Sequence, residues 1–139
     1  MARALHQLFY VSQATADCRE GDIARILATA RRRNRQLDVT GCLLHAGDCF
    51  AQALEGDADR IGELVDRIAA DKRHGGLRIL LSRNVARRSF TDWAMGYVYD
   101  LGKLERLRAA LSADTPPSVE QAMALMGEMR LDPIAGGYC

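Results

Sequence analysis

Gln52 stands out among the residues that could do chemistry, because it lies inside an apolar stretch. That stretch, CFAQALEG at positions 49–56, suits a half-buried strand, and the alternation of a strand puts Gln52 on the same face as Phe50 and Leu54. Tyr10 lies within a second apolar stretch, ALHQLFYVS. A carboxamide both donates and accepts hydrogen bonds, and a phenol can donate one, so the two side chains could bond to each other or to a polar ligand.

Each of these residues also has a purely structural interpretation. Buried polar groups usually bond one another, so a satisfied polar pair in the core is the commoner outcome for Tyr10 or Gln52 taken singly. Asn34 can serve as the C-cap of a helix, and Trp93 alone is more typical of a core than of a cofactor contact. The four residues together, in one register of the predicted fold, favour a shared site.

The segments that position these side chains follow the order β-α-β-β-α-β, with one further strand at the end. Strand patterns occur at 4–12, on both sides of the short connection AGD within 38–56, at 77–85 and at 93–100. Apolar residues recur at helical spacing between them, first at Ile23, Ile26, Leu27 and Ala30 and then at Ile61, Leu64, Val65 and Ile68.

This order predicts the ferredoxin-like fold, which belongs to the α+β class. Its sheet is antiparallel or mixed and carries two helices on one face. In this fold the first and third strands are neighbours at the centre of the sheet, so we expect Tyr10 and Gln52 to meet on the helix-covered face. The first helix is expected to end at about Asn34. The fold alone implies no function.

The character of the chain changes after the last predicted strand. We expect one domain over residues 1–100 and a C-terminal helical extension over residues 101–139. Leucines line one side of a first short helix, and two prolines end it. Ser118 and Gln121 then form a capping box for a second helix rich in methionine. The two short helices are expected to pack on the sheet or on a partner.

Composition and charge argue against several functional classes. With 19 basic and 18 acidic residues the formal charge is +1, which gives no electrostatic footprint for nucleic acid or for an anionic membrane. No stretch approaches the length of a membrane span, and the apolar part of the N-terminus is too short for a secretory signal, so we expect a cytoplasmic protein. The cysteine spacing forms no metal-ligand set, and no nucleophile and base pair indicates an enzyme.

Several motifs in matching order make the chain resemble the BLUF domains, the family of blue-light sensors that use flavin. The stretch LFYVS is similar to the first-strand motif of the family, with its tyrosine. The segment RNRQLDVTGCLLHAGDCFAQALEG is similar to its N…(I/V)TG-x-L…F-x-Q-x-LEG pattern. DKRH is similar to D-x-RH, and RSFTDWAMG to R-x-F-x-x-W-x-M-(G). The resemblance covers about residues 4–100.

The resemblance implies a binding site for FAD and a role for each residue in it. It makes Tyr10 the electron donor to the excited flavin, Gln52 the amide between the phenol and the flavin, and Asn34 the side chain that bonds the polar edge of the ring. The other implied cofactor-binding residues are two walls of the ring slot, Ile26 and Ile68, and four residues near the ribityl or phosphate side, Arg33, Asp71, Arg73 and His74. For Arg33, Arg73 and His74 a solvated face is an equal alternative.

The function that the resemblance implies is blue-light sensing without enzymatic turnover. Light excites the flavin, Tyr10 supplies an electron and then a proton through Gln52, and both return with the Gln52 amide rotated or tautomerised, which leaves a small red shift. Trp93 and Met95 match the pair that relays the signal. Output is expected to reach a homo-oligomer partner or a separate effector protein through the C-terminal helices. The alternative function is a light-insensitive ferredoxin-like module for binding or oligomerisation.

Overall fold

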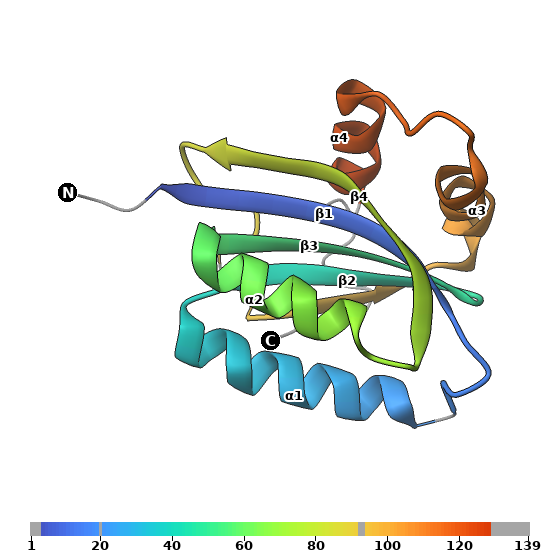
Figure 1. The fold of residues 1–139 in the computed structure, drawn as a ribbon, viewed down its shortest axis with the longest axis horizontal. Helices are drawn as coiled ribbons and strands as arrows, with labels where there is room; N and C mark the ends of the chain where they lie inside the picture. Colours follow the sequence, from blue (N-terminus) through green and yellow to red (C-terminus); the bar gives the residue numbers. More distant parts are fainter. Residues whose placement is uncertain (1–3, 20, 92–93, 129–139) are drawn as a thin grey trace.

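The computed structural model describes residues 4–19, 21–91 and 94–128, and its centre is a mixed sheet of five strands (Figure 1). The elements are β1 (Leu5–Ala14), α1 (Asp22–Leu37), β2 (Thr40–Ala46), β3 (Cys49–Asp57), α2 (Ala58–Ala69), β4 (His74–Val85), β5 (Gly96–Tyr99), the 3-10 helix η1 (Leu101–Lys103), α3 (Leu104–Ser112) and α4 (Val119–Glu128). The strand order is β4-β1-β3-β2-β5, with β5 parallel to β2 and the other three pairings antiparallel. The predicted ferredoxin-like fold with an additional strand is confirmed.

The ends of two elements differ from the prediction. Helix α1 continues past Asn34 to Leu37, because nothing in the polar run that follows Asn34 breaks a helix. It ends at Asp38, whose backbone is left-handed with φ 55°. The interpretation of Asn34 as a C-cap is therefore wrong. Strand β5 begins at Gly96, later than predicted, and Trp93 lies outside the described residues.

Both faces of the sheet are covered by helices. Helices α1 and α2 cover one face, where Leu8 and Tyr10 of β1 are buried, and α3 and α4 cover the other, where Phe9 and Val11 are buried (Figure 1). Successive residues of a strand point to opposite faces, so a strand between two covered faces is apolar without alternation. This accounts for the continuous apolar run at the centre of β1.

A close approach of β2 to β3 supports the strand that carries Gln52. A Cβ atom added at Gly41 would lie 2.1 Å from the carbonyl oxygen of Ala53, so only glycine fits at this point of β2. The hairpin between the two strands turns at Gly47, whose φ is 58°.

The C-terminal helices pack on the sheet. Leu107 of α3 and Met126 of α4 are buried in the same cluster as Phe9 of β1. The predicted capping box is confirmed, because the Ser118 N–H donates to Gln121 Oε1 at 2.9 Å and the Gln121 N–H donates to Ser118 Oγ at 3.1 Å. The division of the chain at residue 100 stays a prediction. No helix in the described parts of the chain has the length and apolar composition that a membrane crossing needs.

Candidate functional site

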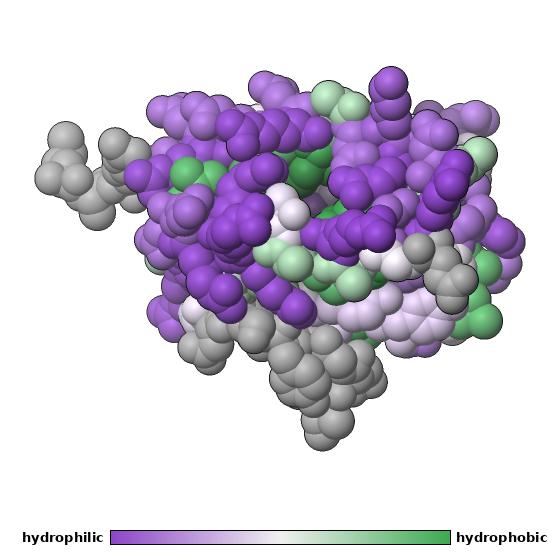
Figure 2. Space-filling model, turned by 90° about the horizontal axis from the view of Figure 1, so that it is seen from below, coloured by the Kyte–Doolittle hydropathy of each residue, from purple (hydrophilic) through white to green (hydrophobic). Residues whose placement is uncertain are grey.

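A pocket between α1, α2 and the sheet gathers the side chains that the sequence indicated. Its lining includes Tyr10, Ile26, Arg33, Asn34, Gln52, Ile68, Asp71, Arg73, His74 and Met95. Figure 2 shows a hollow with hydrophobic side chains inside it and hydrophilic side chains around it. The structure thus brings together all of the predicted site residues that it describes.

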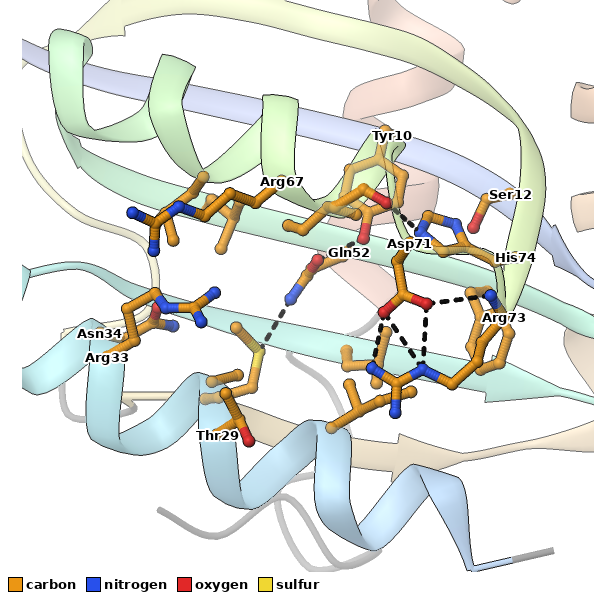
Figure 3. Close-up of a pocket in the computed structure, with 18 of the residues that line it drawn as sticks. Tyr10, Ser12, Thr29, Arg33, Asn34, Gln52, Arg67, Asp71, Arg73 and His74 are labelled. Atoms are coloured by element: carbon orange, nitrogen blue, oxygen red, sulfur yellow. Dashed lines mark hydrogen bonds and ion pairs between the residues drawn. The ribbon is translucent and has the colours of Figure 1, made fainter. Parts of the chain in front are cut away.

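Tyr10, Gln52 and Met95 form a hydrogen-bonded chain inside this pocket. Figure 3 shows the side chains of Tyr10 and Gln52 next to each other. Tyr10 and Gln52 lie directly opposite each other on β1 and β3, and the Tyr10 hydroxyl donates to Gln52 Oε1. Gln52 Nε2 donates in turn to Met95 Sδ at 3.3 Å. Burial, with a smaller contribution from the charge of Asp71, raises the pKa of Tyr10 well above its ordinary value. Tyr10 is therefore a neutral phenol with its proton directed at Gln52.

Two side chains of α1 hold the backbone next to Met95. Asn34 is buried, and its Nδ2 donates to the carbonyl of Ala94 at 2.6 Å. Arg31 Nε donates to the carbonyl of Met95 at 2.9 Å. Asn34 therefore lines the pocket and also anchors the segment that carries Met95.

Charged and polar groups gather at the two ends of the pocket (Figure 3). At one end the Asp71 carboxylate accepts from the Arg73 guanidinium, with Nη2 and Oδ2 separated by 2.6 Å, and this bond lowers the pKa of Asp71. His74 Nε2 donates to the carbonyl of Ile68 at 2.5 Å at the same end. Arg33 and Arg67 lie at the other end. The ends can therefore bind a polar or anionic group, while the middle is apolar.

The residues present fit a flavin, which has a flat apolar ring with polar edges and a polar tail. The walls of the middle are the aliphatic and aromatic side chains of Ile26, Leu43, Phe50, Leu54, Leu64 and Ile68. Two buried polar atoms at the pocket, Ser12 Oγ and His74 Nδ1, have no hydrogen-bond partner among the described residues. Buried polar atoms are nearly always bonded, so these two indicate that a polar ligand completes the site.

Sequence reasoning missed several residues of the lining. Ser12, Thr29 and Arg67 all contribute to it. Ser12 follows Tyr10 by two residues and so lies on the same face of β1. Thr29 follows Ile26 by three residues and so lies on the same side of α1. The strand and helix periods of the sequence therefore place both side chains on the site face. Arg31 gave no such signal, because its partner lies 64 residues away in the chain.

A family model described as "BLUF: Sensors of blue-light using FAD" matches residues 5–96. The chain belongs to the BLUF family. Among its relatives is photoactivated adenylate cyclase subunit beta of Euglena gracilis, 46% identical over 70 residues, which make up 50% of this chain and 8% of that subunit. The "Blue light- and temperature-regulated antirepressor BluF" of Escherichia coli (strain K12) is 35% identical over 102 residues, 73% of this chain and 25% of that protein. The chain thus spans a small part of these relatives.

Solved BLUF structures share its fold over almost the whole chain. The photo-activated state of BlsA superposes with a TM-score of 0.79 at 26% identity, and the match covers 97% of this chain and 99% of BlsA. The dark state of the BLUF protein BlrB gives a TM-score of 0.75 at 28% identity, with 94% of this chain and all of BlrB covered. BLUF domains are flavin-binding sensors of blue light, so the predicted sensor function is confirmed at the level of the family, and residues 5–96 form a sensory domain and not an enzyme.

Proposed function

We propose that this BLUF domain binds one oxidised FAD non-covalently in the pocket between α1 and α2 and detects blue light through Tyr10 and Gln52. The observation that carries the proposal is the hydrogen-bonded chain from the Tyr10 hydroxyl through the Gln52 carboxamide to Met95 Sδ, inside a pocket with apolar walls. When bound, the flavin supplies the absorption of blue light and accepts an electron in its excited state.

Tyr10 is suited to supply both an electron and a proton. Its raised pKa keeps the phenol neutral, and its hydrogen bond to Gln52 Oε1 gives the proton a path. After excitation Tyr10 loses one electron and passes its hydroxyl proton through Gln52. The electron and the proton then return to Tyr10, so no reactant is consumed. The Gln52 amide is left in a changed hydrogen-bonding arrangement.

A rotated Gln52 amide cannot keep its contact with Met95. A thioether sulfur accepts hydrogen bonds and donates none, so a rotation that brings Oε1 to Met95 Sδ removes the donor from the 3.3 Å contact. One neutral hydrogen bond contributes about 0.5–1.5 kcal/mol, whereas moving an equilibrium from 1:99 to 99:1 takes about 5.5 kcal/mol. Repacking of the segment around Met95 must therefore add to the change at Gln52 if the switch is complete.

The other pocket residues bind and orient the cofactor in this proposal. Ile26 and Ile68 are the walls of the ring slot, and Asn34 bonds the polar edge of the ring. Arg33, Arg73, Asp71 and His74 contact the ribityl chain and the phosphates, with Arg67 added from the structure. Guanidinium groups bind phosphate oxygens through charge-assisted hydrogen bonds, which favours a phosphate-bearing flavin over riboflavin.

The purified protein is expected to be yellow and to release all of its flavin when it is denatured. Among the residues that the structure describes, Cys18 is the one cysteine that lines the pocket, and we place no covalent bond to the flavin on it. Unfolding, removal of the protein by filtration and chromatography of the filtrate should recover FAD in a ratio of about one per chain. Pigment that stays on the chain, FMN alone in the filtrate, or a colourless protein that binds no added flavin would each contradict the proposal.

We also propose that the signal leaves through α3 and α4 to a second copy or to a separate effector protein. Helices α3 and α4 cover the face of the sheet opposite to the flavin pocket, and α4 exposes the apolar side chains of Val119 and Met123. Methionine-rich surfaces adapt readily to a partner. A cytoplasmic setting belongs to the same proposal, and the free thiols of Cys18, Cys42 and Cys49 suit a reducing compartment.

Blue light is expected to change hydrogen exchange in the C-terminal helices. A displacement of the sheet alters the packing of Leu107 and Met126 against it, and amides that lose packing exchange faster. The measurement compares exchange over residues 101–128 in the dark and under continuous blue light, together with the oligomer size. The Gln52→Leu variant under the same lamp controls for heating. Identical exchange and size in both states would show that the signal leaves by another surface.

A further inference from the structure

Glu55 carries a buried carboxylate on the face of β3 opposite to the flavin pocket. Its side chain accepts hydrogen bonds from the N–H groups of Ser89 and Phe90, at 2.8 and 2.9 Å, and from Gln7 Nε2 at 2.7 Å. The residue has no solvent exposure. A buried carboxylate is costly unless such donors surround it, so the three bonds fix its position.

The residues that Glu55 holds lie in the connection between β4 and β5, residues 86–95, which also carries Met95. This connection leaves β4 at one edge of the sheet and enters β5 at the other. Phe90 packs in the cluster under α3 and α4, whereas Met95 packs in the cluster under α1 and α2. Phe90 and Met95 of this connection therefore lie against opposite faces of the sheet. Strand β3 contacts it on both faces, through Glu55 at Phe90 and through Gln52 at Met95.

The Glu55 carboxylate is also linked to α4. Gln7 lies directly opposite Glu55 in the ladder of β1 and β3, and directly opposite Arg83 in the ladder of β1 and β4. Arg83 Nε donates to Gln7 Oε1 at 2.9 Å, and Arg83 Nη1 contacts Met123 Sδ at 3.1 Å. One row of side chains across three strands thus joins the connection to α4.

The donors and acceptors of this row allow a single arrangement of Gln7. A carboxylate accepts and a guanidinium donates, so the carboxamide of Gln7 must present its NH₂ to Glu55 and its oxygen to Arg83. Rotation of the Gln7 amide would place its NH₂ against the Arg83 guanidinium, two donors, and its oxygen against the Glu55 carboxylate, two acceptors. The two partners of Gln7 therefore fix the orientation of its amide.

We propose that Glu55 is a positioning residue of this photoreceptor, which fixes the connection that carries Met95 and couples it to α4 through Gln7 and Arg83. The inference rests on the proposed output through the C-terminal helices. When Met95 loses its bond from Gln52, the connection shifts at its Met95 end, and the clamp at Ser89 and Phe90 passes the shift to Arg83 and Met123.

The test exchanges the chemistry of the two central residues. In Glu55→Gln the new carboxamide can still accept from Ser89 and Phe90, but its NH₂ opposes the NH₂ of Gln7, so the row is broken. The double variant Gln7→Glu with Glu55→Gln restores the donor and acceptor pairs of the row, because the carboxylate at position 7 now accepts from Arg83 and from the new amide at position 55. Neither Gln7 nor Glu55 lines the flavin pocket, so the wild type, Glu55→Gln and the double variant are all expected to show the red shift.

The readout is the light-induced change in hydrogen exchange over α4, residues 119–128. We expect Glu55→Gln to lose most of this change and the double variant to recover it. Arg83→Met leaves the bonds of Glu55 to Ser89 and Phe90 intact, and it should also lose the change, which provides a second test if Glu55→Gln does not fold. A full α4 response in Glu55→Gln or in Arg83→Met, or no recovery in the double variant, would overturn the coupling. A wild-type protein that shows the red shift but no change in hydrogen exchange over α4 would also overturn the coupling, and the proposed photoreaction would stand. A wild-type protein without a red shift would overturn both the coupling and the proposed photoreaction.

Discussion

We expect the Gln52→Leu variant to remain yellow and to show no red shift under blue light. Leucine retains the approximate bulk of glutamine, so the apolar slot survives the change. It removes the acceptor of the Tyr10 hydroxyl and the donor to Met95 Sδ, which are the two bonds that the photoreaction rearranges. The buried phenol then lacks a partner at a cost of about 1–3 kcal/mol, which most folded domains tolerate.

The measurement is the light-minus-dark absorption spectrum of the variant with its flavin bound. The matched control is Gln36→Leu, the same substitution at an exposed position of α1 outside the pocket, which should give the wild-type spectrum. A normal, reversible difference spectrum from Gln52→Leu would remove Gln52 from the mechanism. Loss of the response in the control would point to a general effect of the substitution.

The second large effect is expected from Tyr10→Phe, which removes one oxygen atom. Phenylalanine keeps the ring in its place on β1 but has no hydroxyl proton to give and is a poorer electron donor. Because burial raises the pKa of Tyr10, the phenol of the wild-type protein is neutral and its proton is available to Gln52. The variant should bind flavin, lose the red shift, and fluoresce more strongly, since electron transfer no longer quenches the excited flavin.

Tyr97→Phe is the matched control for this change. Tyr97 is a half-buried tyrosine whose hydroxyl is bonded to His45 Nδ1 at 3.1 Å, and it does not line the pocket. Loss of the Tyr97 hydroxyl in Tyr97→Phe should leave both the red shift and the flavin fluorescence as they are in the wild type. A Tyr10→Phe protein with an unchanged difference spectrum would mean that the electron comes from another residue.

The fold followed from periodicities that the sequence displays. Apolar residues at helical spacing marked α1 and α2, and the apolar stretches between them marked the strands, so the order of elements was predicted correctly. The sequence analysis leaves open whether α3 and α4 pack on the sheet or on a partner, although the apolar run LFYV in β1 indicates that they pack on the sheet. A strand that is apolar at successive positions is covered on both faces, and α1 and α2 cover only one.

The site was predictable where a polar residue interrupts an apolar strand. Tyr10 and Gln52 were found in this way, and their resemblance to a family motif supplied the roles. Gln7 and Glu55 interrupt the same two strands on the other face, but the sequence indicates no ligand there and so assigns them no role. Contacts such as Arg31 to Met95 depend on how distant segments pack, and no local spacing reports them.

The central claim is that light rearranges the hydrogen bond between Tyr10 and Gln52 beside a bound flavin. The most direct test is the absorption spectrum of the purified, flavin-loaded protein before, during and after a pulse of blue light. The account predicts a small shift of the flavin bands to longer wavelength with no bleaching, and full return to the first spectrum in the dark. A spectrum that does not change, or one that bleaches and needs an added oxidant to recover, would contradict it.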